Sequence, residues 1–408
     1  MEKKNILNVT NDVKWIGALD FDIVSFDVVM ETQNGTTYNS YFIDAEKKTV
    51  VDTVKERFWD DYYAKLKQLV NPEEIRYIVV SHTEPDHSGC LRNLLNVAPN
   101  ATVVGSSNAI RYLKDMIGPE FPHQVVRGGQ TIDLGNKTLH VIGAPNLHWP
   151  DSIYTWLPDD RVLFTCDSFG CHYCNEEMFD DRVGNFDDAF KYYFDVILKP
   201  FSKHLLKAIE KIRPLGIDVV CPGHGPILRS HWKKYVDVSE QYAIAAINER
   251  QKQRVYIPYV SAYHKTGVLA EYIAKGLREA GDIEVELQDI EKTPIGEMDE
   301  KIARSSAIII GSPTINQNIL LPVYKLFATI NPLRDKGKLA GAFGSYGWSG
   351  ENKKMIESNL VNLKLNFFDE GVFVKFSPSA DEVKTSIAYG KAFGEALLSQ
   401  EESVAVSN

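Results

Sequence analysis

The chain has few cysteines, no long apolar run and no excess of positive charge. Its 5 cysteines in 408 residues do not make a disulfide framework, and an odd number fits a reducing compartment. No run of about 18 apolar residues indicates a membrane span, and the first four residues lead into polar sequence rather than a signal segment. The net charge of −10 argues against nucleic acid as the main partner, because phosphate contacts need clustered cations. We therefore expect a cytoplasmic protein that binds neither membrane nor nucleic acid.

The residue pattern changes near residue 250. Apolar residues make up 44% of the chain and charged residues 25%, which is ordinary for globular domains, and the length suits two or three of them. Before residue 250, short apolar runs between turn residues predict mostly strands, and an amphipathic stretch from Trp232 to Gln253 predicts a long helix. After it, strands alternate with helices, as in a doubly wound parallel sheet of flavodoxin-like order. We expect domains at 1–250 and 251–402, joined near Gln251, and a polar tail at 403–408.

Four potential metal ligands lie within six residues, directly after a predicted buried strand. They are His82, Glu84, Asp86 and His87. Such crowding on a turn stiffened by proline is unfavourable unless a cation offsets the repulsion and desolvation of these groups. Three further candidates each lie where another predicted strand runs into a loop, namely His148, Asp167 and His224. Several loops can therefore converge on one metal site.

The spacing of these residues matches the paired metal sites of the metallo-β-lactamase superfamily. Hydrolases of that superfamily carry His-x-His-x-Asp-His and usually bind zinc, but here Glu84 stands in place of the middle histidine. A carboxylate is a harder ligand than imidazole, so it favours iron or manganese over zinc. A bridging aspartate can hold two metals about 3.5 Å apart.

Three loops of the second domain predict a flavin site. The first begins a helix, where hydroxyl and backbone N–H groups can hold a phosphate, and the other two can flank a planar ring. No Gly-x-Gly-x-x-Gly fingerprint and no P-loop occur in the chain, which disfavours NAD, FAD and ATP. We expect FMN, with candidate contacts Ser261, Tyr263, His264, Lys265, Thr266, Ser312, Pro313, Thr314, Asn316, Ser345, Tyr346, Gly347, Trp348, Ser349 and Gly350.

With these motifs, the whole chain resembles the flavodiiron proteins (A-type flavoproteins), whose diagnostic motif is His-x-Glu-x-Asp-His. The resemblance implies an N-terminal metallo-β-lactamase-like αββα sandwich and a C-terminal flavodoxin-like domain. It implies two non-haem irons, one bound by His82, Glu84 and His148 and the other by Asp86, His87 and His224, with Asp167 as the bridge. It also implies reduction of O2 to water or of NO to N2O with electrons from FMN, and a tyrosine, Tyr193 or Tyr192, that donates a hydrogen bond in the diiron pocket.

The resemblance further implies how electrons reach the irons. Members of the family form head-to-tail homodimers, sometimes paired into tetramers, in which the FMN of one chain faces the irons of the other. No Cys-x-x-Cys pair follows the flavodoxin-like region, so we expect no fused rubredoxin domain. A separate rubredoxin or flavin reductase is then the expected electron donor.

Some alternatives stay open at this point. A zinc-dependent hydrolase of the metallo-β-lactamase type, with the flavodoxin-like domain as an accessory module, uses the same ligands. A gas sensor that binds NO without turnover is a third reading. The sequence does not decide whether O2 or NO is preferred. It also leaves the roles of Cys171, His172 and Cys174 open: we interpret the two cysteines as ordinary free thiols, and the histidine as either a loop residue or a support for a metal ligand.

Overall fold

The computed structural model describes residues 6–26, 30–249 and 253–405 of the chain. The chain divides into two compact units, one formed by residues up to 26 together with 31–246, and the other containing the residues from 247 onward. The predicted junction at Gln251 lies outside the described residues. No helix in the described ranges is long and apolar enough to cross a membrane.

The first unit is built on two β-sheets. One sheet has the strand order β1 (Leu7–Asn8), β2 (Val13–Trp15), β7 (Tyr41–Ile43), β8 (Lys48–Val51), β9 (Ile75–Val79), β10 (Thr102–Gly105) and β11 (His123–Val125). The other has the order β12 (Thr131–Asp133), β13 (Thr138–Gly143), β14 (Ile153–Leu157), β15 (Val162–Cys166) and β16 (Val219–Pro222). One apolar cluster contains side chains of both sheets, such as Trp15, Val79, Val141 and Phe164, so the sheets pack face to face.

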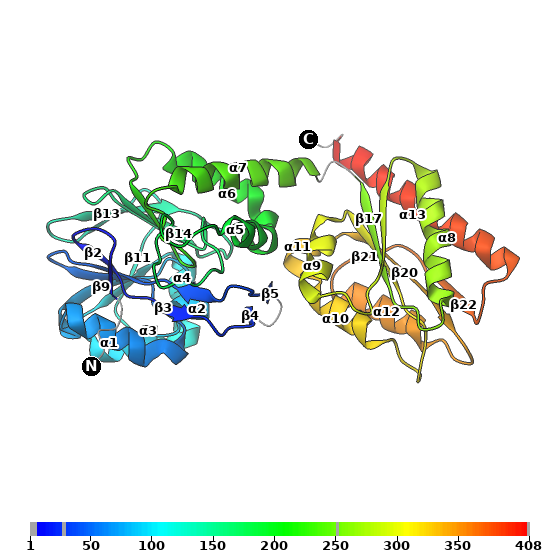
Figure 1. Ribbon diagram of the computed structural model, residues 1–408, viewed down its shortest axis with the longest axis horizontal. Coiled ribbons are helices and arrows are strands. Elements are labelled where there is room, and N and C mark those ends of the chain that lie inside the picture. Colours follow the sequence, from blue (N-terminus) through cyan, green and yellow to red (C-terminus); the bar gives the residue numbers. More distant parts are fainter. Residues whose placement is uncertain (1–5, 27–29, 250–252, 406–408) are drawn as a thin grey trace. The chain divides into compact units, whose positions relative to one another are not determined.

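Helices cover the outer sides of these two sheets. Figure 1 shows α1 (Trp59–Leu69) and α3 (Leu91–Val97) along one side, and α6 (Ser202–Ile212) and α7 (Trp232–Glu249) along the opposite side. The remaining α-helices in the described part of this unit are α2 (Pro85–Ser88), α4 (Ser107–Ile117) and α5 (Asp187–Tyr193). Two short strand pairs join β3 (Ala18–Asp20) to β6 (Thr36–Tyr38) and β4 (Ser25–Phe26) to β5 (Met30–Glu31). This is the predicted αββα sandwich.

The second unit contains one parallel sheet. Its order is β18 (Glu284–Asp289), β17 (Arg254–Tyr259), β19 (Ala307–Gly311), β20 (Leu339–Tyr346) and β21 (Asn366–Phe367), and β22 (Val372–Lys375) also pairs with β20. Because β21 and β22 pair with successive parts of β20, they act as one interrupted fifth strand. The sheet therefore has the predicted flavodoxin-like order, in which ligands bind beyond the carboxyl ends of the strands.

Helices lie on both faces of this sheet (Figure 1). One apolar cluster joins the sheet to α8 (Lys265–Ala280) and α13 (Ala380–Ala405), and the other joins it to α9 (Ile295–Arg304), α10 (Leu321–Thr329) and α12 (Glu351–Asn362). A short helix, α11, spans Pro332–Asp335. Helix α13 runs to Ala405, so the expected polar tail from residue 403 begins as a continuation of this helix rather than as a separate segment.

Candidate metal centre and cofactor cavity

The seven predicted metal ligands lie together at one edge of the two-sheet unit. His82 and Glu84 lie between β9 and α2, and Asp86 and His87 are in α2, which begins at Pro85. The other three come from the second sheet: His148 precedes β14, Asp167 follows β15, and His224 follows β16. Segments far apart in the sequence therefore meet because both sheets end at this edge.

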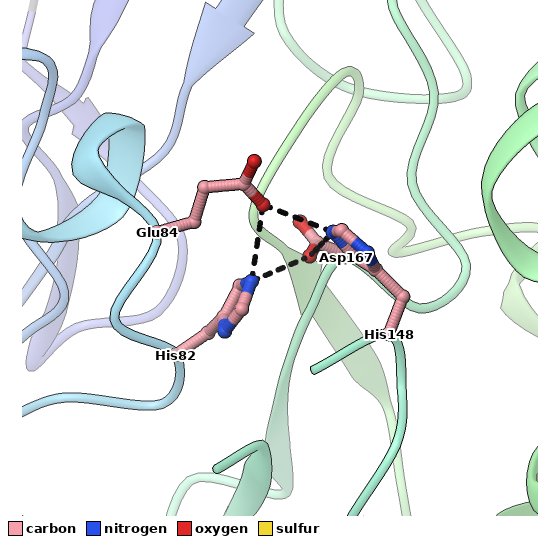
Figure 2. Close-up of side chains that lie close together, drawn as sticks. All are labelled: His82, Glu84, His148 and Asp167. Atoms are coloured by element: carbon pink, nitrogen blue, oxygen red, sulfur yellow. Dashed lines mark hydrogen bonds and ion pairs between the residues drawn. The ribbon is translucent and has the colours of Figure 1, made fainter. Parts of the chain in front are cut away.

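One cluster of donor atoms contains two imidazoles and two carboxylates (Figure 2). Oε2 of Glu84 lies 2.9 Å from Nε2 of His148 and 3.2 Å from Nε2 of His82. Oδ2 of Asp167 lies 3.5 Å from Nε2 of His148 and 3.6 Å from Nε2 of His82. Ligand atoms bound at about 2.0–2.2 Å to a common metal are separated by similar distances, so this cluster can hold a metal ion.

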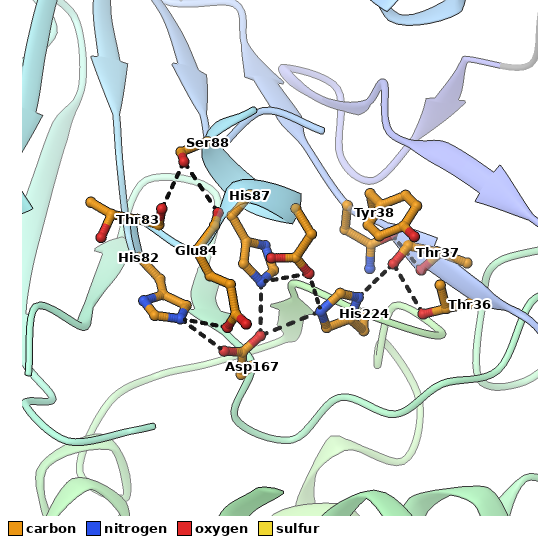
Figure 3. Close-up of polar contacts among 12 residues, drawn as sticks. Thr36, Thr37, Tyr38, His82, Thr83, Glu84, His87, Ser88, Asp167 and His224 are labelled. Carbon is orange, nitrogen blue, oxygen red and sulfur yellow. Dashed lines mark hydrogen bonds and ion pairs between the residues drawn. The ribbon is translucent and has the colours of Figure 1, made fainter. Parts of the chain in front are cut away.

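A second cluster lies on the other side of Asp167 (Figure 3). Nε2 of His224 is 3.1 Å from Oδ2 of Asp86, and Nε2 of His87 is 3.5 Å from the same atom. The remaining oxygen of Asp167, Oδ1, lies 2.9 Å from Nε2 of His87 and 3.5 Å from Nε2 of His224. The two oxygens of one carboxylate therefore face two different ligand clusters, which is the arrangement of a bridging ligand.

The hydrogen bonding of these side chains fits metal ions better than a purely structural network. Asp86 and Asp167 are almost fully buried, yet neither oxygen of Asp86 nor Oδ2 of Asp167 accepts a hydrogen bond of acceptable geometry from the described residues. Buried carboxylate oxygens without partners are costly. Cations placed between these oxygens and the imidazoles would satisfy them.

Neighbouring groups orient two of the imidazoles toward the clusters. Nδ1 of His82 lies 3.2 Å from Asp151, whose other oxygen accepts hydrogen bonds from the backbone and hydroxyl of Thr83. Nδ1 of His224 donates to the carbonyl of Thr37 at 2.6 Å. Because Nδ1 holds the proton, Nε2 keeps a lone pair for a metal. Asp151 and Thr37 were not identified from the sequence; the position of Asp151, three residues after His148 in the same loop, was the available signal.

In the metal-free protein, the clustered groups change one another's protonation. Burial alone would lower the pKa of His82, but hydrogen bonds to Asp151 and Glu84 and the charge of Asp167 raise it to about 10. Burial alone would raise the pKa of Glu84, but hydrogen bonds from His148 and His82 hold it below its usual range. The carboxylates are thus charged, and a metal must displace a proton from His82 on binding.

Tyr193 and His172 lie beside the second cluster. Tyr193 is buried, its hydroxyl has no hydrogen-bond partner within the described ranges, and its ring centroid is 6.1 Å from that of His224. The ring of His172 is 4.9 Å from Tyr193 and 5.1 Å from His224, and burial lowers the pKa of His172 well below its ordinary value. Cys171 and Cys174 are free thiols, and burial raises the pKa of each.

A cavity of about 520 Å³ lies at the carboxyl ends of strands β17, β19 and β20. Eleven of the predicted FMN contacts line it: Tyr263, Lys265, Thr266, Pro313, Thr314, Asn316, Ser345, Tyr346, Gly347, Trp348 and Ser349. Its lining contains Lys265 and no acidic residue, and Lys265 and Thr266 are in the first turn of α8, whose backbone N–H groups lack acceptors within the helix. Both features fit a phosphate group, and the aromatic side chains fit a flavin ring.

Four predicted FMN contacts do not line this cavity. The hydroxyl of Ser261 accepts a hydrogen bond from the backbone of Gly267, and Ser312 is buried with its hydroxyl donating to the carbonyl of Pro313. His264 and Gly350 are the N-terminal cap positions of α8 and α12. These residues shape the loops rather than the cavity wall.

Four lining residues were missed from the sequence. Ile315 and Gln317 belong to a loop that was identified, whereas Phe376 and Ser377 directly follow β22. The same rule that identified the other loops, the carboxyl end of a parallel strand, applies to β22. Phe376 and Ser377 could therefore have been predicted from their position after β22.

Comparisons with known proteins agree with the two-domain organisation. Residues 36–225 match the family described as ODP family beta lactamase, and residues 257–390 match the flavodoxin family. The chain is 39% identical over 395 residues to the type A flavoprotein fprA of Rhodobacter capsulatus, covering 95% of this chain and 91% of that protein. It is 34% identical over 391 residues to a protein of Moorella thermoacetica named nitric oxide reductase, covering 94% and 96% of the two chains.

Among solved structures, proteins of the same kind have this fold. The solved structure of rubredoxin oxygen:oxidoreductase from the anaerobe Desulfovibrio gigas superposes with a TM-score of 0.74 at 30% identity, covering 97% of this chain and 99% of that one. Proteins of this kind are oxidoreductases that carry FMN and a non-haem diiron centre, and this chain has a cavity and a paired ligand cluster that fit both. By its sequence, its two domains and its structure, the chain belongs to the type A flavoprotein family, the flavodiiron proteins.

Proposed function

We propose that the protein reduces O2 to water, NO to N2O, or both, at a diiron centre that receives its electrons from FMN. The observation that carries this proposal is that the two oxygens of Asp167 face two different ligand clusters. One of these clusters contains Glu84 instead of a third histidine. Two metals bridged in this way can bind a diatomic substrate, or two NO molecules, at neighbouring positions.

We propose that His82, Glu84 and His148 bind one iron, that Asp86, His87 and His224 bind the other, and that Asp167 bridges them. When bound, the irons and FMN supply the redox chemistry. The chain supplies three negative charges, from Glu84, Asp86 and Asp167, which stabilise the higher oxidation state of the metals. Glu84 also makes the first cluster harder than the zinc sites of hydrolases, which favours iron. The hydroxyl of the buried Tyr193 is a candidate hydrogen-bond donor to the substrate.

We propose rubredoxin or a flavin reductase as the electron donor and the cytoplasm as the location. The name of the Desulfovibrio gigas relative supports rubredoxin and O2, and the name of the Moorella thermoacetica relative supports NO. The ligand clusters favour neither gas, because either can bind at an open position between two metals. Selectivity must lie in the surroundings of the ligands.

We further propose a head-to-tail homodimer, in which the flavin of one chain faces the metals of its partner. Two aromatic side chains at the cofactor cavity are largely exposed, Tyr263 at 79% and Trp348 at 86%. Two apolar residues just before β4 are also exposed, Phe21 at 53% and Val24 at 80%, and β4 contains Phe26, which stacks on His172. An interface that covered the cofactor cavity and the segment leading into β4 would bury these exposed apolar groups. A monomer in sedimentation experiments would contradict this arrangement.

The reductase proposal is tested by composition and by turnover. Purified protein should contain about two irons and one FMN per chain, and with reduced rubredoxin it should consume O2, NO or both in the steady state. Zinc without flavin, together with ester or thioester hydrolysis in the absence of reductant, would contradict the proposal. Stopped-flow mixing of reduced protein with each gas excludes a sensor if FMN is reoxidised over many turnovers; stoichiometric binding without reoxidation would support the sensor instead.

A further inference from the structure

His172 is held in one orientation beside the second ligand cluster. His172 is buried, with only 6% of the residue exposed, and three rings surround its side chain. Phe26 stacks on it with centroids 4.4 Å apart, and Tyr193 and His224 contact it edge to face at 4.9 and 5.1 Å. These contacts hold the plane of the His172 ring.

A hydroxyl group determines which nitrogen of His172 carries the proton. Oγ1 of Thr36, in β6, lies 2.8 Å from Nδ1 of His172. The other acceptor near this hydroxyl, the carbonyl of Thr37, is 3.5 Å away and already accepts a hydrogen bond from His224 at 2.6 Å. The hydroxyl of Thr36 therefore donates to Nδ1 of His172, and the proton of the neutral ring is on Nε2.

This N–H group is buried without an acceptor. Neither Nε2 of His172 nor the hydroxyl of Tyr193 has a hydrogen-bond partner within the described ranges. Both side chains pack on His224, a member of the cluster with Asp86 and His87. In the other cluster, His82 and His148 pack against Trp149, and His148 also packs against Phe201. The two clusters therefore have different surroundings: buried hydrogen-bond donors lie beside the second, and aromatic rings lie beside the first. Buried donors without acceptors are costly unless a ligand satisfies them.

We propose that Thr36 and His172 form a pair that offers an Nε2–H donor to the small ligand bound at the metal held by Asp86, His87 and His224. This inference rests on the proposed diiron function and deepens it. His172 is then a residue that touches the substrate, and Thr36 is a positioning residue that acts through it. A fixed N–H donor at this position stabilises negative charge on the ligand. The pair thereby makes one of the two metal positions the preferred site for charge on the substrate.

Azide binding to the oxidised holoenzyme tests this inference without turnover. Azide is a small anion that accepts hydrogen bonds, and its charge-transfer absorption with ferric iron reports its Kd. Thr36→Val keeps the shape of the side chain but removes the hydroxyl, and His172→Leu removes the donor. Each should raise the Kd about tenfold, as for one lost hydrogen bond. Thr36→Ser, the matched control, should stay within about twofold of the wild type. Unchanged affinity in both Thr36→Val and His172→Leu, at full iron and FMN content, would overturn the inference.

A second measurement separates this inference from the diiron function. In protein reconstituted with zinc, ¹⁵N NMR of labelled histidines reports the tautomer of His172 directly. We expect Nε2–H in the wild type and in Thr36→Ser, and loss of this single tautomer in Thr36→Val. A wild-type ring protonated on Nδ1 would overturn the inference whatever metal the protein uses. A protein that takes up no iron would contradict the proposed function, while the tautomer would still decide the pairing of Thr36 with His172.

Discussion

Oε2 of Glu84 lies 2.9 Å from Nε2 of His148, although 64 residues separate the two in the chain. The same oxygen lies 3.2 Å from Nε2 of His82, so this carboxylate occupies the centre of the first ligand cluster. In a related zinc hydrolase a histidine would stand at this position. The exchange of one neutral imidazole for one carboxylate changes both the charge and the hardness of the site.

Replacing Glu84 with histidine should therefore change the metal preference. We expect Glu84→His to lower the iron content below about two per chain, to favour zinc uptake and to reduce reductase activity at least about tenfold, because a neutral ligand stabilises ferric iron less well. FMN content should not change. Metal analysis and steady-state turnover measure the effect, with Glu120→His, at an exposed position, as the control. Wild-type iron content and activity in Glu84→His would show that this residue is not a ligand.

Asp167 should be needed for both metals. Asp167→Asn keeps the size of the side chain, but an amide offers only one oxygen and no charge. It therefore cannot supply an oxygen ligand both to the cluster with His87 and to the cluster with His148. We expect iron to fall to about one per chain or less, measured by metal analysis and by loss of magnetic coupling between the irons in Mössbauer spectra. Asp115→Asn, on the exposed face of α4, is the control. Two coupled irons in Asp167→Asn would refute the bridging role.

Asp151 should tune metal affinity without touching the metal. Its carboxylate lies 3.2 Å from Nδ1 of His82 and accepts two hydrogen bonds from Thr83. Asp151→Asn loses the charge that holds the proton on Nδ1, so we expect the Kd for Fe(II) to rise about 10- to 100-fold, as is typical for such supporting groups. Competition with a chelator measures this Kd. An unchanged value would mean that His82 is oriented by other contacts.

Lys265 should contribute to flavin affinity by its charge. It lines a cavity that contains no acidic residue, so its ammonium group can attract the phosphate of FMN. We expect Lys265→Met to raise the Kd for FMN about tenfold at low salt, with a smaller effect at high salt because ions screen the charge. Lys275→Met, also in α8 but pairing with Glu279, should bind FMN like the wild type. Titration of the deflavinated protein with FMN, followed by fluorescence, decides between these outcomes.

Metal removal should give the protein a distinctive dependence on pH. In the metal-free protein the pKa of His82 is raised to about 10, against about 6.5 for an unfolded histidine. The folded state then holds a proton that the unfolded state loses, so the stability contributed by His82 is complete below pH about 6.5 and is lost as the pH rises toward 10, by at most about 1.4 kcal/mol per pH unit.

Thermal unfolding at several pH values measures this effect. The Tm of the metal-free protein should fall between pH 6.5 and 9, and the increase in Tm on adding metal should grow over the same range, because displacing the proton of His82 costs less free energy as the pH rises. The pKa of the buried His87 is also raised, by the charges of Asp86 and Asp167, so His82→Gln should reduce the slope without abolishing it, whereas His123→Gln, at an exposed position of β11, should keep it. A metal-free Tm that rises from pH 6.5 to 9 would contradict the raised pKa.

Much of the site could be predicted from the sequence because its signals are local. The ligands of the motif lie within six residues, and the turn after a buried strand is marked by its own polar residues and by Pro85. Helix α9 also carries a local signal, because its apolar residues Ile295, Met298 and Ile302 are spaced three and four apart among charged residues. Phe376 was not predicted, although it directly follows the carboxyl end of β22 and lines the cofactor cavity.

By itself, the sequence determined the types of ligand, the presence of Glu84 and the order of strands and helices, because side-chain chemistry and hydrophobic period are properties of short segments. Only the tertiary structure decided that one oxygen of Asp167 faces His87 and the other faces His148, and that Thr36 binds His172 from 136 residues away. These contacts depend on how two sheets pack through one shared core. Packing sums many weak interactions across the whole unit, and no short segment encodes its result.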